Sequence, residues 1–164
     1  MTDRAVFLLT FASALGSGLV AGIFYAFSTA VMRALGALAP AHGAAAMQSI
    51  NVAVFNPLFM GALFGTAALC AIAAAASYFV WQEPGAKFLL AGSVVYLLGC
   101  IFVTGAFNVP LNNALAVAEP TTADGIALWT RYLVDWTWWN HVRTAACLAA
   151  SALFIVALVS RASP

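Results

Sequence analysis

Long apolar runs dominate the chain, and short polar segments separate them. Four stretches contain no Asp, Glu, Lys or Arg, namely residues 5–32, 34–82, 88–118 and 144–160. A helix needs roughly 20 mostly apolar residues to cross a bilayer. The pattern therefore predicts four membrane-spanning helices, over about residues 6–35, 57–81, 87–107 and 124–160.

The segments between the runs predict how these helices are connected. Residues 40–54 place Met47, Ile50 and Val54 on one helical face, which predicts a short interfacial helix between the first and second spans. Asn56-Pro57 is typical of a helix start. Asn108 and Pro110 predict the end of the third span, with Asn108 as a cap. A helix from Thr121 or Thr122 is expected to extend into the fourth span.

Composition supports a membrane protein of one domain, spanning 1–164. The chain is 65% hydrophobic and 7% charged, whereas about a quarter of the residues in a soluble domain are charged. The net charge of +1 gives no sign of nucleic-acid binding. The cysteines lie in apolar runs without a CxxC motif, which favours small core residues. We expect an all-α integral membrane four-helix bundle in the bacterial inner membrane, with cytoplasmic termini.

Polar and aromatic residues gather at one end of this predicted bundle. Four spans place both termini at one end, so the loops at the other end collect a set of amides, tryptophans and basic residues: His42, Gln48, Asn51, Asn56, Asn108, Asn112, Asn113, Trp136, Trp138, Trp139, Asn140, His141 and Arg143. Polar groups at membrane depth are costly unless they are paired or line a cavity. The cluster predicts a site, with an interfacial aromatic belt as the alternative.

Helical geometry divides the polar end of the fourth span into two faces. At about 100° per residue, Trp136, Trp139, Asn140 and Arg143 share one side. His141 lies on the far side from Arg143, so both side chains cannot point straight at one small ligand. Tyr25 belongs to a polar stripe on the first span, where it either lines a cavity or contributes to the interfacial belt.

Few cofactor chemistries suit this set of residues. The chain has two histidines and no HxxxH or ExxH motif, so a metal site of His42 and His141 is a weak candidate, and a haem meets the same difficulty. We expect no cofactor, with metal or haem left open. One histidine as a base, amide and arginine donors, and large rings suit a planar phenolic or acidic apolar substrate from the bilayer.

Four motifs together resemble the anthrone oxygenase-like family, also called DUF1772. These are GIFYAFSTAVMRAL, INVAVFNPLFM, FNVPLNNAL and WTWWNHVRT, and they extend from the first span to the fourth. The resemblance implies a four-helix membrane monooxygenase that oxidises an anthrone to an anthraquinone with O2 and without a known organic cofactor. The matching positions are Asn108, Pro110, Asn112, Trp139, Asn140, His141 and Arg143.

A catalytic hypothesis assigns roles to these residues. His141 removes a proton from the substrate, and Arg143, Asn108 and Asn112 hold the resulting enolate oxygen. The substrate-binding residues are expected to be Trp136, Trp139, Asn140, Tyr25 and Asn56.

Two other functions stay open. One is a non-catalytic membrane protein, or a subunit of a complex, that binds a lipid, a quinone or an aromatic compound. The other is a metal-dependent oxidase that uses His141 and His42. The expected partners are a small aromatic substrate, O2 and membrane lipid. Gly18 and Gly22 form a face of small residues on the first span, which would permit a homo-oligomer.

Overall fold

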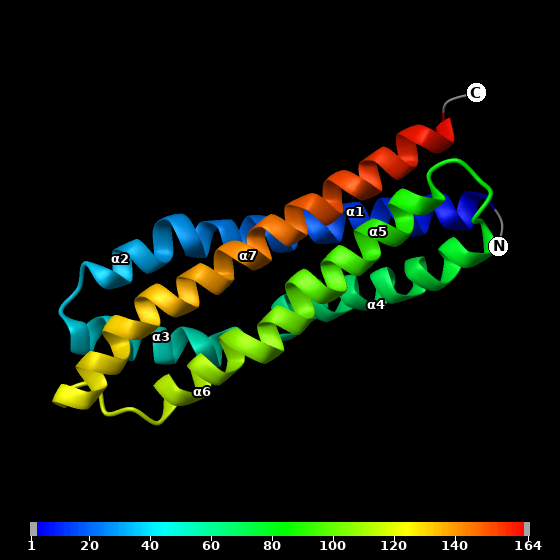
Figure 1. The fold of residues 1–164 in the computed structure, drawn as a ribbon. Helices are drawn as coiled ribbons and strands as arrows, with labels where there is room; N and C mark the ends of the chain where they lie inside the picture. The colour runs from blue at the N-terminus through cyan, green and yellow to red at the C-terminus, as the bar shows by residue number, and fades with distance from the viewer. Residues whose placement is uncertain (1–2, 163–164) are drawn as a thin grey trace.

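Helices form the entire regular structure of the described chain (Figure 1). The computed structural model describes residues 3–162. Four helical stretches are long and apolar enough to cross a membrane: Asp3–Gly36, Pro57–Phe79, Ala86–Ala116 and Ala123–Arg161. The predicted all-α fold with four spans is therefore confirmed, and the spans indicate an integral membrane protein.

The first half of the chain builds two spans and a short helix between them. The first span joins α1 (Asp3–Ala26), the π-helical segment η1 (Phe27–Val31) and α2 (Met32–Gly36). The short helix α3 (Pro40–Ala53) packs against α2, α6 and α7. Asn56 caps α4 (Pro57–Phe79), because its side-chain oxygen accepts from the backbone N–H groups of Leu58 and Phe59.

The second half builds the other two spans. The third consists of α5 (Ala86–Tyr96), two π-helical segments η2 (Leu97–Phe102) and η3 (Thr104–Asn108), and α6 (Val109–Ala116). The fourth lies within one helix of 40 residues, α7 (Ala123–Ala162). At 1.5 Å per residue α7 is about 60 Å long, roughly twice the thickness of a hydrocarbon core. The predicted extension before the fourth span is thus continuous with it.

The third span is longer than the sequence predicted. The helix was expected to end near residue 107, but it continues through Pro110 to Ala116. Asn108 has helical backbone angles and makes no side-chain cap. The π-helical segment η3 ends at Asn108, two residues before Pro110. A π-helical turn changes the backbone hydrogen-bond register, which lets a helix accommodate a residue without an N–H. The amide of Asn108 is thereby left for a contact with α7.

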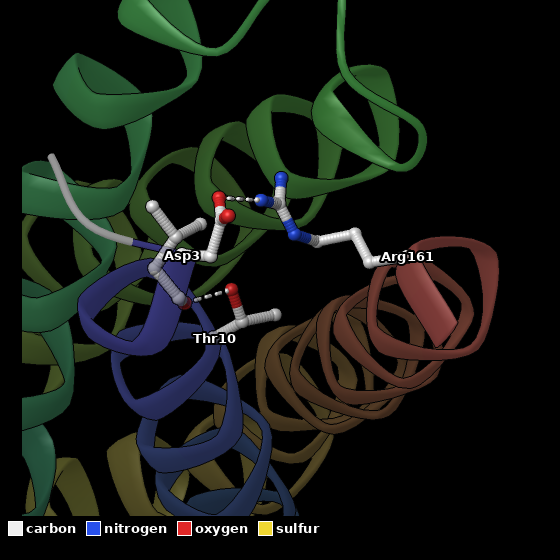
Figure 2. A network of polar contacts seen from close by, with 4 residues as sticks. Asp3, Thr10 and Arg161 are labelled. Carbon is white, nitrogen blue, oxygen red and sulfur yellow. Dashed lines mark hydrogen bonds and ion pairs between the residues drawn. The ribbon is translucent and has the colours of Figure 1, made fainter. Parts of the chain in front are cut away.

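Both termini lie at the same end of the bundle as the α4–α5 turn (Figure 1). Gly85, with φ of 83°, provides the left-handed residue that this tight turn requires. Arg161 Nη2 lies 3.2 Å from Asp3 Oδ1, so an ion pair joins the start of α1 to the end of α7 (Figure 2). The α2–α3 and α6–α7 connections lie at the opposite end (Figure 1).

Two buried apolar clusters hold the bundle together. One lies around Phe24, Cys100 and Phe154, and the other, at the α3 end, lies around Met47, Trp129 and Trp136. The cysteines Cys70, Cys100 and Cys147 are free and buried, as the sequence predicted. Large apolar side chains such as Leu58, at 87% exposed, cover the outside of the bundle. This distribution suits a protein whose surroundings are lipid.

Small residues allow the helices to approach closely. A Cβ atom on Gly16 would collide with Thr66 of α4, and one on Gly99 would collide with Ala146 of α7. Gly18 lies against Ser151 of α7, but Gly22 has open space around it. The expected face of Gly18 and Gly22 therefore contributes one contact within the bundle, at Gly18.

Candidate functional site

A buried arginine near the middle of α7 is the centre of the site. Arg143 is 4% exposed, and its guanidinium carbon lies 4.1 Å from the ring centroid of Phe24 and 5.1 Å from that of Trp136. Nη1 donates to Oγ1 of Thr104 at 3.2 Å, and Nη2 donates to Oδ1 of Asn140 at 2.7 Å. Cation–π contacts and neutral oxygens thus surround the charge.

No carboxylate balances this charge within the part of the chain that the structure describes. The ion pairs there are Arg131–Asp135 and Arg161–Asp3, and neither involves Arg143. Burying a cation away from water and without an anion costs several kcal/mol. The arrangement is therefore well suited to an anionic ligand, which would supply the missing charge.

Asn140 fixes the position of the guanidinium. It is fully buried, and its Nδ2 donates to the backbone oxygen of Phe24 at 2.7 Å and to Oγ of Ser28 at 2.6 Å. Its oxygen remains free to accept from Arg143. Asn140 therefore links α7 to the first span and orients Arg143 through the same side chain.

Aromatic rings form a continuous column along the inner face of α7. Trp129 stacks on Tyr132 with ring centroids 5.7 Å apart, and Tyr132 stacks on Trp136 at 5.9 Å. Trp136 also contacts Phe27 of η1 at 6.0 Å. The column leads from the second apolar cluster to Arg143, so it supplies flat apolar walls beside the charge.

A cavity of about 130 Å³ lies between this column and the α3–α4 junction. Its lining combines many apolar residues with a few polar ones, namely Ile23, Phe24, Phe27, Met47, Ile50, Asn51, Val54, Phe55, Phe59, Met60, Leu63, Phe64, Thr104, Val109, Asn112, Trp136 and Arg143. Phe55 and Phe64 are 77% and 54% exposed. The cavity therefore reaches the outer, lipid-facing surface, where an apolar molecule could enter.

The third span contributes amides and a hydroxyl to the site. Asn108 is buried and donates from Nδ2 to the backbone oxygen of Trp136 at 3.2 Å. Asn112 lines the cavity and accepts from the hydroxyl of Tyr132 at 2.8 Å. Thr104 and Asn108 both belong to η3, and Ser28 belongs to η1. π-Helical turns occur frequently at functional sites, and here they flank the arginine from two spans.

The structure brings together only part of the predicted site. Arg143, Trp136 and Asn112 line one cavity, and Asn140 and Asn108 support them from behind. The expected division of α7 into two faces is visible, since Trp136, Asn140 and Arg143 are buried while His141 is exposed.

Four other predicted residues lie outside the cavity lining. Tyr25 is 58% exposed on the outside of the bundle. Asn56 is occupied in capping α4. Trp139 stacks on Phe107 with centroids 3.7 Å apart. His141 is exposed, because it lies about 100° around the helix from Asn140.

The two histidines are not part of a group of side chains that could hold a metal ion in the described chain. His42 is exposed in the first turn of α3, and His141 is exposed on α7. Within residues 3–162, no group of three or more His, Cys, Asp or Glu side chains is placed to hold a metal ion. The weak site suggested by His42 and His141 therefore lacks a third such ligand there.

Several contacts of the site were not predicted from the sequence. Phe24 and Ser28 hold Asn140, Thr104 holds Arg143, and Tyr132 holds Asn112. The sequence spacing could have indicated some of these groupings. Phe24 and Ser28 are four residues apart, as are Thr104 and Asn108, and residues at this spacing lie on the same face of a helix. Which of these faces points towards α7 is decided by the packing of the spans.

Comparison with known proteins identifies the family. The family model for anthrone oxygenase matches residues 55–153, which is more than half of the chain. No curated protein and no solved structure matches the chain. The match begins at the α3–α4 junction and covers α4, the third span and most of α7, including Asn108, Asn112, Trp136, Asn140 and Arg143. The chain therefore belongs to the anthrone oxygenase family.

Proposed function

We propose that the protein is a membrane-embedded oxygenase that oxidises a planar, phenolic or anthrone-like apolar substrate with O2. Family membership supports the reaction class. The observation that carries the proposal is the buried guanidinium of Arg143, which has no carboxylate partner in the described chain and lines an apolar cavity with aromatic walls. Such a site stabilises a flat organic anion better than a neutral molecule.

The anion in this proposal is the enolate of the substrate. An anthrone has a methylene group conjugated to a carbonyl, and loss of a methylene proton places negative charge on the carbonyl oxygen. Arg143 is the one ionisable residue in the cavity lining of the described chain. The substrate therefore loses this proton to water at the membrane surface before it is enclosed, and the role of the protein is to bind and stabilise the enolate. His141, which is exposed, receives no step in this scheme.

Oxidation then follows from the electron-rich ring system. The enolate carbon gives an electron pair to O2 and forms a bond to one of its oxygen atoms, which leaves a peroxide anion. This anion takes up a proton from water, its O–O bond breaks, and the one hydrogen left on the carbon departs with the outer oxygen atom as water. The products are the quinone and one water molecule. Phe24, Phe27 and Trp136 hold the ring system flat and exclude water from the reacting carbon.

The test is O2 uptake and product formation by protein in lipid nanodiscs supplied with 1,8-dihydroxyanthrone, after subtraction of autoxidation in empty nanodiscs. Mass spectrometry with ¹⁸O2 should show one labelled oxygen in the quinone. Arg143→Met should lower turnover about 100-fold or more, the range seen when a charge-stabilising donor is removed. Arg33→Met, at an exposed arginine of α2, is the matched control and should retain wild-type turnover.

Binding of the aromatic compound without turnover above the autoxidation rate would contradict the proposal. That result would favour a protein that binds lipids, quinones or aromatic compounds without catalysis. Elemental analysis of the same preparation addresses the metal-dependent alternative, which requires a stoichiometric transition metal that His42→Ala or His141→Ala removes.

We also propose that the protein lies in a bacterial inner membrane with both termini in the cytoplasm. The four spans suggest a membrane location and are compatible with termini on one side. Labelling of a single cysteine placed in the α4–α5 turn, in a variant without the native cysteines, tests this orientation. Protection of that position from a membrane-impermeant reagent in whole cells is the expected result, and labelling of it would reverse the orientation.

A further inference from the structure

Three cavity-lining residues carry N–H groups that lack an acceptor. Arg143 Nε, Trp136 Nε1 and Asn51 Nδ2 are all buried atoms, and none has a hydrogen-bond partner among residues 3–162. The residues come from α3 and α7, and all three line the same cavity. An unpaired buried donor normally destabilises a fold. Three such donors around one cavity indicate a site that is completed by a ligand with oxygen atoms.

Asn51 is the member of this set that the proposed reaction does not use. It lies near the C-terminal end of α3, outside the span that holds Arg143. The Tyr132 hydroxyl lies beside the Asn51 amide, but it donates to Oδ1 of Asn112 at 2.8 Å, and Asn51 Nδ2 has no acceptor in hydrogen-bond geometry among residues 3–162. The Asn51 amide therefore keeps a donor available to whatever occupies the cavity.

The rest of α3 is held in place independently of Asn51. Gln48, one turn earlier, donates from Nε2 to the backbone oxygens of Leu115 at 2.7 Å and Ala118 at 3.0 Å. Met47 and Ala44 are buried in the second apolar cluster. These contacts anchor α3 against the end of α6, so the position of Asn51 does not depend on hydrogen bonds of its own side chain.

We infer that Asn51 is a ligand-binding residue that, together with the indole N–H of Trp136, donates hydrogen bonds to oxygen substituents on the ring system of the ligand. The cavity then selects planar aromatics that carry hydroxyl or carbonyl oxygens in addition to the oxygen held by Arg143. The inference rests on the proposed function for the ring system of the ligand. It makes Asn51 a specificity-determining residue and leaves the enolate charge to Arg143.

A binding experiment with two unreactive probes tests this role. Wild-type protein in nanodiscs is titrated with 1,8-dihydroxyanthraquinone and with unsubstituted 9,10-anthraquinone, and quenching of tryptophan fluorescence reports binding. The wild type should bind the hydroxylated probe more tightly by about 3- to 10-fold, the range of one neutral hydrogen bond. Asn51→Leu should reduce that ratio to about 1, mainly by weakening binding of the hydroxylated probe.

The stability of the same variant separates ligand binding from a structural role. Leucine has the same number and branching of side-chain heavy atoms as asparagine and carries no donor, and the cavity beside residue 51 has room for its larger methyl groups. Asn51→Leu should therefore keep or raise the melting temperature of the ligand-free protein. Ser49→Ala is the matched control on the exposed face of α3, and it should preserve both the binding ratio and the melting temperature.

Three results would overturn the inference. The first is an unchanged binding ratio in Asn51→Leu, and the second is an equal loss of affinity for both probes with a lower melting temperature. The third is a wild type that binds neither probe. Turnover of 1,8-dihydroxyanthrone is measured separately, so intact selectivity without turnover counts against the proposed function alone. Intact turnover with an unchanged ratio counts against the role of Asn51 alone.

Discussion

Arg143 and Asn140, three residues apart on α7, form a buried pair in which Nη2 of the arginine donates to Oδ1 of the asparagine at 2.7 Å. The amide is neutral, so it orients the guanidinium without cancelling its charge. A carboxylate at the same position would satisfy the arginine completely and leave no charge for a ligand. The choice of amide over acid at residue 140 is therefore central to the proposed chemistry.

Asn140→Asp should lower turnover through this pair. The new carboxylate lies beside Arg143 and competes with the substrate anion, so turnover should fall about 10-fold or more. O2 uptake with 1,8-dihydroxyanthrone measures the effect, and a thermal melt checks the fold. Turnover equal to that of the wild type would show that the free charge of Arg143 is not needed.

Replacement of Trp136 and replacement of Trp139 should have different effects, the first on ligand binding and the second on stability. Trp136 lines the cavity, whereas Trp139 stacks on Phe107 outside the lining. Trp136→Leu should weaken binding of 1,8-dihydroxyanthraquinone by about 10-fold, since a stacked aromatic pair and its buried area are lost.

Trp139→Leu serves as the comparison within the same helix. It should reduce the free energy of unfolding by about 1 kcal/mol through loss of the Phe107 stack, with the affinity for the probe nearly unchanged. Titration and thermal melts of both variants test this contrast. A larger loss of affinity in Trp139→Leu would restore the substrate-binding role that the sequence suggested for Trp139.

His141→Ala should retain turnover within about two-fold of the wild type, because a surface substitution away from the cavity seldom changes stability or geometry. The imidazole is exposed and does not line the cavity. Initial rates of O2 uptake over a range of pH give the comparison. A loss of about 100-fold, the effect typical of a missing general base, would place His141 in the reaction as the sequence hypothesis had it.

Gly99→Ala should destabilise the bundle at the crossing of the third and fourth spans. A Cβ there collides with the Cβ of Ala146, and overpacking of this kind costs about 1–3 kcal/mol. Gly61→Ala in α4 is the control, because a Cβ at Gly61 meets nothing within 4 Å. Thermal unfolding in detergent compares the two variants. Equal melting temperatures would mean that the two spans move apart at this point without a penalty.

Almost all of the fold could be derived from the sequence, because the hydropathy and charge of each segment decide by themselves whether that segment can span a membrane. Runs without charge defined the four spans, and Asn56-Pro57 correctly predicted the start of α4. The end of the third span could not be derived, since whether Pro110 breaks a helix depends on whether neighbouring helices and π-helical turns satisfy the backbone around it.

The candidate site was only partly predictable, for a geometric reason. Helical periodicity alone separated His141 from Arg143 and grouped Arg143 with Trp136 and Asn140. It did not show which face is buried, because both faces of α7 carry aromatic and polar residues. It also assigned Trp139 to the side of Arg143, although the ring of Trp139 turns to Phe107.

The sequence by itself determined the membrane class, the number of spans and the end of the bundle at which polar groups gather. These features follow from the energetic cost of placing charges in hydrocarbon, and this cost applies to each segment independently of the others. Only the tertiary structure decided that Arg143 faces the cavity, that Phe24 and Thr104 support the site, and that His141 lies outside. Such relations depend on the rotation of each helix about its axis, and that rotation is set by contacts between residues far apart in the chain.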